Sequence, residues 1–272
     1  MTLQRVIPAK AGIHQISPYI ILSIFSFFAL ISPSFVSADA KSDYDFQYGQ
    51  YRQNYPEYAL LKADYLNTPS LDNQQKAMLA AKQTIYSRDL VKASFAWYLL
   101  DLINSSKANY EPVQPIITSL SNSREFYMKE AQKSQSIVTQ EDLKKFTAGY
   151  LKDVIHHDRM IKFGILANKI TSLVRIQLDS KKALDTLSSK LPVPQPAILA
   201  ERIQELTNSS KAIDLKIDTI AKNLNIVDAE EEADAEIFFN SRVEKIVEIQ
   251  TLQLDWINRL IDIDKNYAQP NR

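Results

Sequence analysis

Residues that could perform acid–base or metal chemistry gather at one place in this sequence, where Asp153, His156, His157 and Asp158 fall within six positions. On a helix, Asp153 and His157 would lie one turn apart on the same face, so that the carboxylate and the imidazole could meet. A metal could use both histidines, but helical di-metal sites repeat a carboxylate-x-x-His motif on a second helix, and this sequence has one copy. We favour a hydrogen-bonded histidine at a helix interface and keep these four residues as the alternative metal ligands.

The composition excludes most other kinds of active site. The chain of 272 residues has no cysteine, which excludes disulfides, thiolate zinc sites and cysteine nucleophiles. Its four glycines are too scattered to form a phosphate-binding loop, and it has neither an H-E-x-x-H motif nor a serine in a nucleophile-elbow context. The 32 basic residues are balanced by 32 acidic ones, leaving no surplus for nucleic acid. We therefore expect no enzyme activity, no cofactor and no nucleic-acid partner.

A row of tyrosines is the second candidate surface. Alternating spacings of four and three residues place the following residues on one helix face: Tyr44, Tyr48, Tyr51, Tyr55, Tyr58, Lys62 and Tyr65. Because phenol hydroxyls need partners or water, we expect this face to be half wet. It could stack on a ligand or a partner protein, but we favour packing against the following helix, where Arg88 could contact the rings or hydroxyls. Pro56 must kink this helix or begin a new segment.

The elements that would position these residues are all helical. Long glycine-free stretches carry apolar residues at helical spacing, and no run of alternating β-branched residues indicates a strand. Prolines and N-cap residues, among them Thr139 in a variant capping box with Asp142, divide the chain into six helices. The expected ranges are 43–67, 70–105, 112–136, 139–190, 196–226 and 229–266.

Heptad repeats mark the last three expected helices. The fifth has an apolar seam broken only by Ser210: Leu199, Ile203, Leu206, Ile213, Ile217, Ile220, Leu224 and Val227. The fourth carries a similar seam that is interrupted at Gln177 and Ser180. On the sixth we place the seam along one line, with Ile246, Trp256 and Leu260 beside it: Val243, Val247, Gln250, Leu254, Ile257 and Ile261. Three such stripes can cover one another in an antiparallel bundle.

The expected fold is therefore all-α, an elongated antiparallel bundle with coiled-coil-like segments. Residues 39–150 would form an N-terminal helical module that begins with the tyrosine-striped helix. Residues 151–272 would form a three-helix bundle, and the long helix over 139–190 would belong to both modules.

The first 38 residues are typical of a signal peptide. Arg5 and Lys10 precede an uncharged stretch from Gln15 to Ala38, which holds a long apolar core and ends in small residues that a signal peptidase recognises. The alternative is an uncleaved membrane anchor, because the uncharged stretch could just span a bilayer. Either interpretation places the rest of the chain outside the cytoplasm, as a secreted, periplasmic or cell-envelope protein.

The stretch from Tyr48 to Leu102 combines regularly spaced tyrosines, a turn at Thr68 to Ser70 and an Arg88-Asp89 pair in the next helix. This pattern resembles uncharacterised exported helical proteins of candidate-phylum bacteria. The resemblance implies an extracytoplasmic helical protein without an assigned activity, and it transfers no functional residues.

We therefore expect a non-enzymatic helical bundle that serves as a spacer, envelope scaffold or protein-binding and adhesion module. Its partner would be another protein or an envelope component, and its coiled-coil seams could also associate with a second copy. The alternative is a ligand or metal carrier that uses the tyrosine groove or the His156 and His157 cluster.

Overall fold

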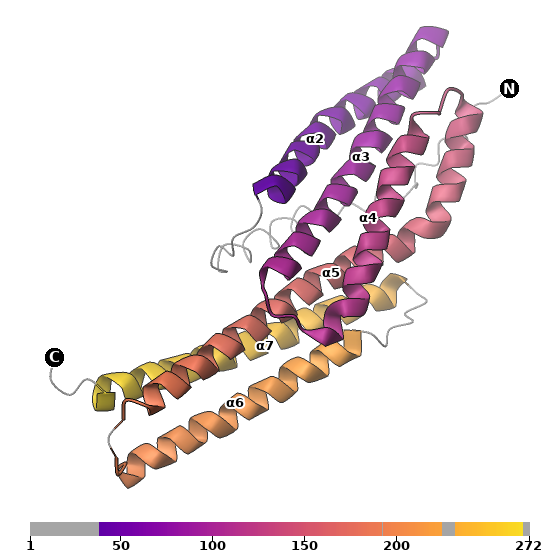
Figure 1. Cartoon of the computed structure of the whole chain (residues 1–272). Helices are drawn as coiled ribbons and strands as arrows, with labels where there is room; N and C mark the ends of the chain where they lie inside the picture. Colours follow the sequence, from indigo (N-terminus) through magenta and orange to yellow (C-terminus); the bar gives the residue numbers. More distant parts are fainter. Residues whose placement is uncertain (1–37, 192, 225–231, 269–272) are drawn as a thin grey trace. The chain divides into compact units, whose positions relative to one another are not determined.

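The computed structural model describes residues 38–191, 193–224 and 232–268, and within these ranges all regular structure is helical. The helices are α2 (Ala38–Asn67), α3 (Leu71–Ser105), α4 (Gln114–Ser134), α5 (Gln140–Ser188), α6 (Ala197–Leu224) and α7 (Glu232–Ile263), with short turns η1 (Glu111–Val113) and η2 (Asp264–Ala268) (Figure 1). The expected all-α class is confirmed. The expected signal peptide lies outside the described residues. No helix within the described ranges has the length and apolar character needed to cross a bilayer.

Local sequence signals account for the helix ends. Thr139 and Asp142 form the expected capping box at the start of α5, with each side chain accepting a hydrogen bond from the other residue's backbone N–H. Ser70 caps α3 by accepting from the backbone of Asn73 at 3.1 Å. Pro56 does not end its helix, because α2 continues through it to Asn67.

The N-terminal half of the structure is organised around α3. This helix contacts α2, α4 and α5, and α4 also contacts α5 (Figure 1). Small side chains buried on the first half of α3, from Ala77 to Ser87, allow neighbouring helices to approach closely. At Gly164 of α5 a Cβ atom would lie 2.8 Å from a methyl carbon of Leu120, so this glycine permits the contact between α5 and α4.

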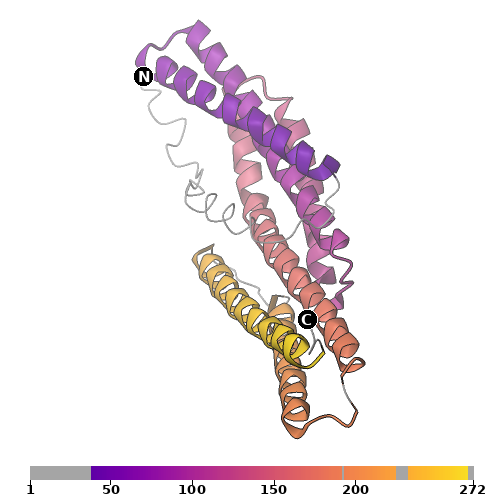
Figure 2. The same ribbon diagram turned by 90° about the vertical axis from the view of Figure 1, so that its left-hand side faces the viewer.

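The C-terminal half consists of α6, α7 and the second half of α5 (Figure 2). Ion pairs show that α6 and α7 run antiparallel, because Lys216 binds Glu248 whereas Glu205, nearer the start of α6, binds Arg259, nearer the end of α7. All helices from α2 to α7 belong to a single unit, in which α5 contacts helices on both sides of the boundary expected at residue 150.

The seams expected on α5 and α6 are confirmed. The seam residues of α6 from Leu199 to Leu224 are buried, with Ile203 partly so, and the polar interruptions Gln177 and Ser210 are buried as well. Val227 lies outside the described residues.

The seam that we placed on α7 is wrong. The side chains that α7 buries follow a neighbouring line, which we call the inner line: Ile246, Ile249, Gln253, Trp256, Leu260 and Ile263. The expected seam forms what we call the outer line: Val243, Val247, Gln250, Leu254, Ile257 and Ile261. Both lines have heptad spacing, and α7 turns the inner one toward α5 and α6 because it carries the large Trp256 ring. The Trp256 indole N–H donates to the backbone oxygen of Leu206 on α6 at 2.8 Å.

Three polar seam residues meet in one layer inside this bundle. The Gln177 amide of α5 donates to the hydroxyl of Ser210 on α6 at 2.9 Å, and the Gln253 amide of α7 donates to the Gln177 carbonyl at 3.3 Å and to the Leu173 backbone at 2.9 Å. Because each helix supplies one member, the layer fixes the register of all three helices.

Replacing the whole layer with apolar residues should therefore raise the stability of the bundle while making the register of its helices less well defined. A triple variant, Gln177→Leu, Ser210→Ala and Gln253→Leu, should unfold at a higher urea concentration, because buried polar groups are often less stabilising than apolar residues of similar volume. It should also lose well-dispersed side-chain NMR signals, because the apolar seams can then slide. A single Gln253→Leu variant should be destabilised by about 1–3 kcal/mol, since it leaves the Gln177 carbonyl unpaired. A triple variant with lower stability and unchanged spectra would contradict a register role.

Candidate functional site

The tyrosine row packs against α3, as we favoured. Its members are partly buried, and Tyr55 is the most exposed of them at 37%. The Tyr44 ring lies 5.1 Å from Phe95 and 6.1 Å from Tyr98, both on α3, and burial raises the pKa of Tyr44 to about 12. The row is therefore half-buried, as the sequence predicts, and Tyr44 at its start packs on aromatic residues of α3.

Arg88 contacts a different tyrosine from those we considered. Its guanidinium binds both carboxylate oxygens of Asp89, at 2.8 and 3.1 Å, and lies 4.2 Å above the ring of Tyr150 on α5. The Tyr150 hydroxyl donates to Asp89 at 3.0 Å. Asp89 is fully buried, and this burial raises its pKa against the opposing attraction of Arg88. These three residues form a compact ionic group between α3 and α5.

A second ionic group lies one turn further along α3. The Lys92 ammonium binds both oxygens of Asp158 on α5, at 2.7 and 2.9 Å, and the hydroxyl of Tyr127 on α4 donates to the same carboxylate at 2.5 Å. Burial lowers the pKa of Lys92, and the attraction of Asp158 opposes that shift. Asp158 is thus committed to holding α3, α4 and α5 together.

His156 and His157 lie beside this second group. His157 contacts residues of α4, whereas His156 is exposed. The His157 Nδ1 lies 3.0 Å from the hydroxyl of Ser123 on α4, and its ring stacks on Phe126 at 3.9 Å. His156 and Asp153 are exposed. The expected pairing of Asp153 with His157 is replaced by the Ser123 contact, because the imidazole turns into the α4–α5 interface.

Neither Ser123 nor Phe126 could be identified from the sequence as a partner of His157, because both lie on another helix more than 30 residues away. Across the described ranges, no three His, Asp or Glu side chains are grouped as a metal site would need. The four candidate ligands are therefore split between an interface and the surface.

The half-buried His157 should make stability depend on pH. Burial, and then the nearby His156, lower the pKa of His157 below its ordinary value of 6.5. The folded state therefore favours the neutral ring, so this stabilisation is complete above pH 6.5 and is lost as the pH falls through the lower folded pKa. We expect the urea midpoint to fall between pH 7 and pH 5, and a His157→Gln variant to show a shallower fall.

A matched change at the exposed neighbour provides the control. His156→Gln should keep most of the slope, because desolvation of His157 is the larger cause of its shift. Equal slopes in the wild type and in His157→Gln would show that the ring titrates as it does in water.

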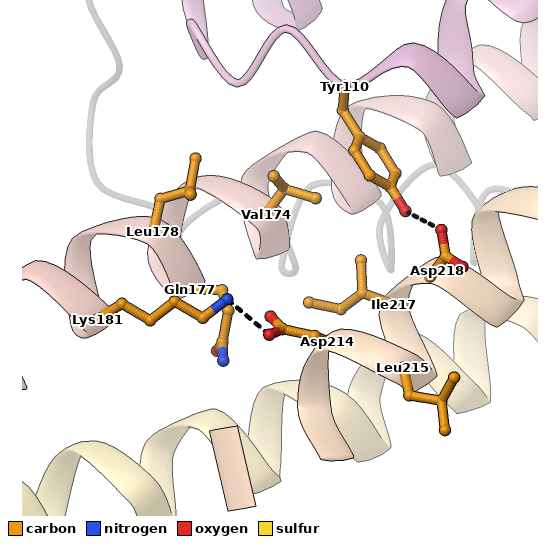
Figure 3. A pocket seen from close by; sticks show the side chains of 9 residues that line it. All are labelled: Tyr110, Val174, Gln177, Leu178, Lys181, Asp214, Leu215, Ile217 and Asp218. Carbon is orange, nitrogen blue, oxygen red and sulfur yellow. Dashed lines mark hydrogen bonds and ion pairs between the residues drawn. The ribbon is translucent and has the colours of Figure 1, made fainter. Parts of the chain in front are cut away.

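A pocket of about 460 Å³ opens between α5 and α6, beside Tyr110 (Figure 3). Its polar side chains bind one another: Lys181 pairs with Asp214 at 2.6 Å, and the Tyr110 hydroxyl donates to Asp218 at 3.1 Å. Burial and the Asp218 contact raise the pKa of Tyr110. The surface that a bound ligand could contact is therefore mainly aliphatic and includes Leu178 and Leu215.

The outer line of α7 is a regularly spaced and mainly apolar surface that the described helices leave partly exposed. Val247, Leu254 and Ile261 are spaced seven residues apart and remain 39%, 60% and 42% exposed. The alternate members Val243 and Ile257 are partly buried at the edge of the core. Scattered apolar residues are normal on a protein surface, but a heptad line of them has the form of a helix-binding interface.

Comparison with known proteins finds no matching family model, no matching curated protein and no matching solved structure.

Proposed function

We propose that this chain is a non-enzymatic, extracytoplasmic helical bundle that acts by binding another helical surface, as an envelope scaffold, spacer or adhesion module. The observation that carries the proposal is the outer line of α7, whose exposed members Val247, Leu254 and Ile261 repeat every seven residues. A folded monomer gains nothing from keeping such a line in water, whereas a helical partner would bury it.

The contacts of the acidic, tyrosine and histidine side chains between α3, α4 and α5 also support a non-enzymatic function. Asp89, Asp158, Tyr127, Tyr150 and His157 all bind neighbouring helices, so their polar groups serve the packing of α3, α4 and α5. The extracytoplasmic part of the proposal rests on the signal-peptide character of residues 1–38.

A photo-crosslinking amino acid at Leu254 would test the binding function in an exporting bacterial cell. We expect discrete crosslinked bands from this position and none from the matched control position Ile198, which is equally exposed on α6 but lies off the outer line. Equal crosslinking from both positions, or none from Leu254, would reject a specific binding surface there.

The carrier alternative predicts a different result. If the chain binds metal through His156 and His157, the wild type should retain stoichiometric zinc or nickel through chelator washing, and His157→Ala should lose it. We expect no retained metal, because the His157 imidazole is held by Ser123 and Phe126.

A further inference from the structure

We propose that the outer line of α7 binds the outer line of a second copy of this chain, antiparallel and about a twofold axis. The inference rests on the proposed function, because it names the partner for the same surface.

The spacing of the outer line specifies the kind of partner. Its six members alternate steps of four and three residues over about 27 Å of helix, at 1.5 Å per residue. Only another helix with the same period can stay in contact along such a line, since side chains of one helix fill gaps between those of the other. The line also continues the intramolecular interface, because Val243 and Ile257 already pack at the edge of the core.

The outer line is complementary to itself when two copies run antiparallel. With the axis midway between Gln250 and Leu254, Val243 of one copy faces Ile261 of the other, Val247 faces Ile257, and Gln250 faces Leu254. Each layer then joins an exposed side chain to a partly buried one. Protruding residues meet recessed ones along the whole contact, which is the arrangement that packs without gaps.

The residues beside the line favour the antiparallel direction. The flanking positions, again seven residues apart and all exposed, are Glu244, Thr251, Asn258 and Lys265. Antiparallel pairing places Glu244 opposite the neutral Asn258 and Thr251 opposite its own copy. Parallel pairing would instead place this exposed flank beside Ile246, Gln253 and Leu260 of the other copy, which are already buried in that copy's own core.

The nearest other acid, Glu248, is turned away from the outer line and binds Lys216 of α6 at 2.7 Å. Asp255 and Asp262 lie on the same side of the helix as Glu248, because they follow it at steps of seven residues. No ion pair of the monomer therefore has to break for two copies to meet.

The small size of the contact indicates a transient interface rather than a permanent one. One pair of helices of this length buries on the order of 1,000 Å², which is below the size of most permanent interfaces. The pairing should therefore be reversible and concentration-dependent, and it would strengthen where many copies share the confined space of an envelope.

Sedimentation equilibrium of the purified full chain tests this pairing. We expect a monomer–dimer equilibrium in the wild type and a dissociation constant at least about tenfold higher in Leu254→Glu. Ile198→Glu, which adds the same charge at an equally exposed site off the line, should leave the constant unchanged. Circular dichroism should show that both variants are folded. A wild type that stays monomeric at near-millimolar concentration, or a Leu254→Glu variant that dimerises normally, would overturn the proposal.

The absence of cysteine from the chain permits a direct test of direction. Mixing Glu244→Cys with Asn258→Cys should give a mixed disulfide dimer upon mild oxidation, because these positions face each other in the antiparallel pair. Each variant alone should give little dimer. Abundant dimer from Glu244→Cys alone would contradict the antiparallel arrangement.

A monomeric chain whose Leu254 position crosslinks to a different protein in the cell would refute self-pairing and leave the binding function standing. A monomeric chain without such crosslinks would refute both.

Discussion

Replacing Ile217 with aspartate should unfold the bundle of α5, α6 and α7. Ile217 lies at the centre of the α6 seam and is 3% exposed, so the variant would place a carboxylate among apolar side chains without a partner. Burying an unpaired charge costs several kcal/mol, a large part of the stability of a typical domain. Thermal and urea unfolding followed by circular dichroism would measure the loss.

The matched control for this variant lies two residues away. Leu215 is on the same helix but is 68% exposed, so Leu215→Asp should change stability by no more than about 0.5 kcal/mol. If the two variants unfold at the same urea concentration, the assignment of the buried face of α6 is wrong.

Removing the carboxylate of Asp89 should have a comparable effect in the other half of the structure. Asp89→Ala leaves the Arg88 guanidinium between α3 and α5 without its bidentate partner, and it removes the acceptor of the Tyr150 hydroxyl. Breaking a buried ion pair from one side typically costs about 3–5 kcal/mol, because the remaining charge stays buried and unpaired.

Two further variants test whether the loss of stability comes from leaving one charge of the pair buried without its partner. Arg88→Met combined with Asp89→Leu should recover most of the loss, because it removes both charges together. Asp179→Ala breaks the exposed pair with Arg175 and should cost no more than about 1 kcal/mol. Equal losses for Asp89→Ala and Asp179→Ala, in urea unfolding, would show that the Arg88 group is not a buried ion pair.

The fold was predictable from the sequence because its signals are local. Prolines, caps and heptad spacing lie within one or two turns of the boundaries they set, and the observed ends of α3, α5 and α6 fall within two residues of the expected ones. The capping box at Thr139 shows how one short motif is enough to place the start of a helix.

The wrong seam on α7 has a physical reason. Two apolar heptad lines lie side by side on this helix, and each contains one glutamine, Gln253 on the inner line and Gln250 on the outer line, so the sequence of α7 alone does not distinguish them. The choice depends on partners in other helices: Gln253 finds Gln177, and Trp256 finds the Leu206 backbone. Like the seams of α5 and α6, each line is interrupted by a polar residue, and these polar residues can pair with one another inside the bundle. This signal favours a polar layer but does not show which glutamine of α7 joins it.

The candidate site was predictable only in part. Tyrosine spacing correctly indicated a half-buried interface on α3, because that is a property of one helix face. The partners of Arg88 and His157 could not be derived, because Tyr150 and Ser123 come from other helices and carry no spacing relation to them.

We infer that α7 divides its apolar residues between an inner line for the chain's own core and an outer line for a partner. Thiol labelling of single-cysteine variants tests it directly, with Leu254→Cys for the outer line and Ile249→Cys for the inner line. In dilute purified protein we predict rapid labelling at position 254 and protection at position 249, whereas in exporting cells position 254 should become protected as well. Labelling at position 254 that is as rapid in the cell as in dilute solution would contradict this division.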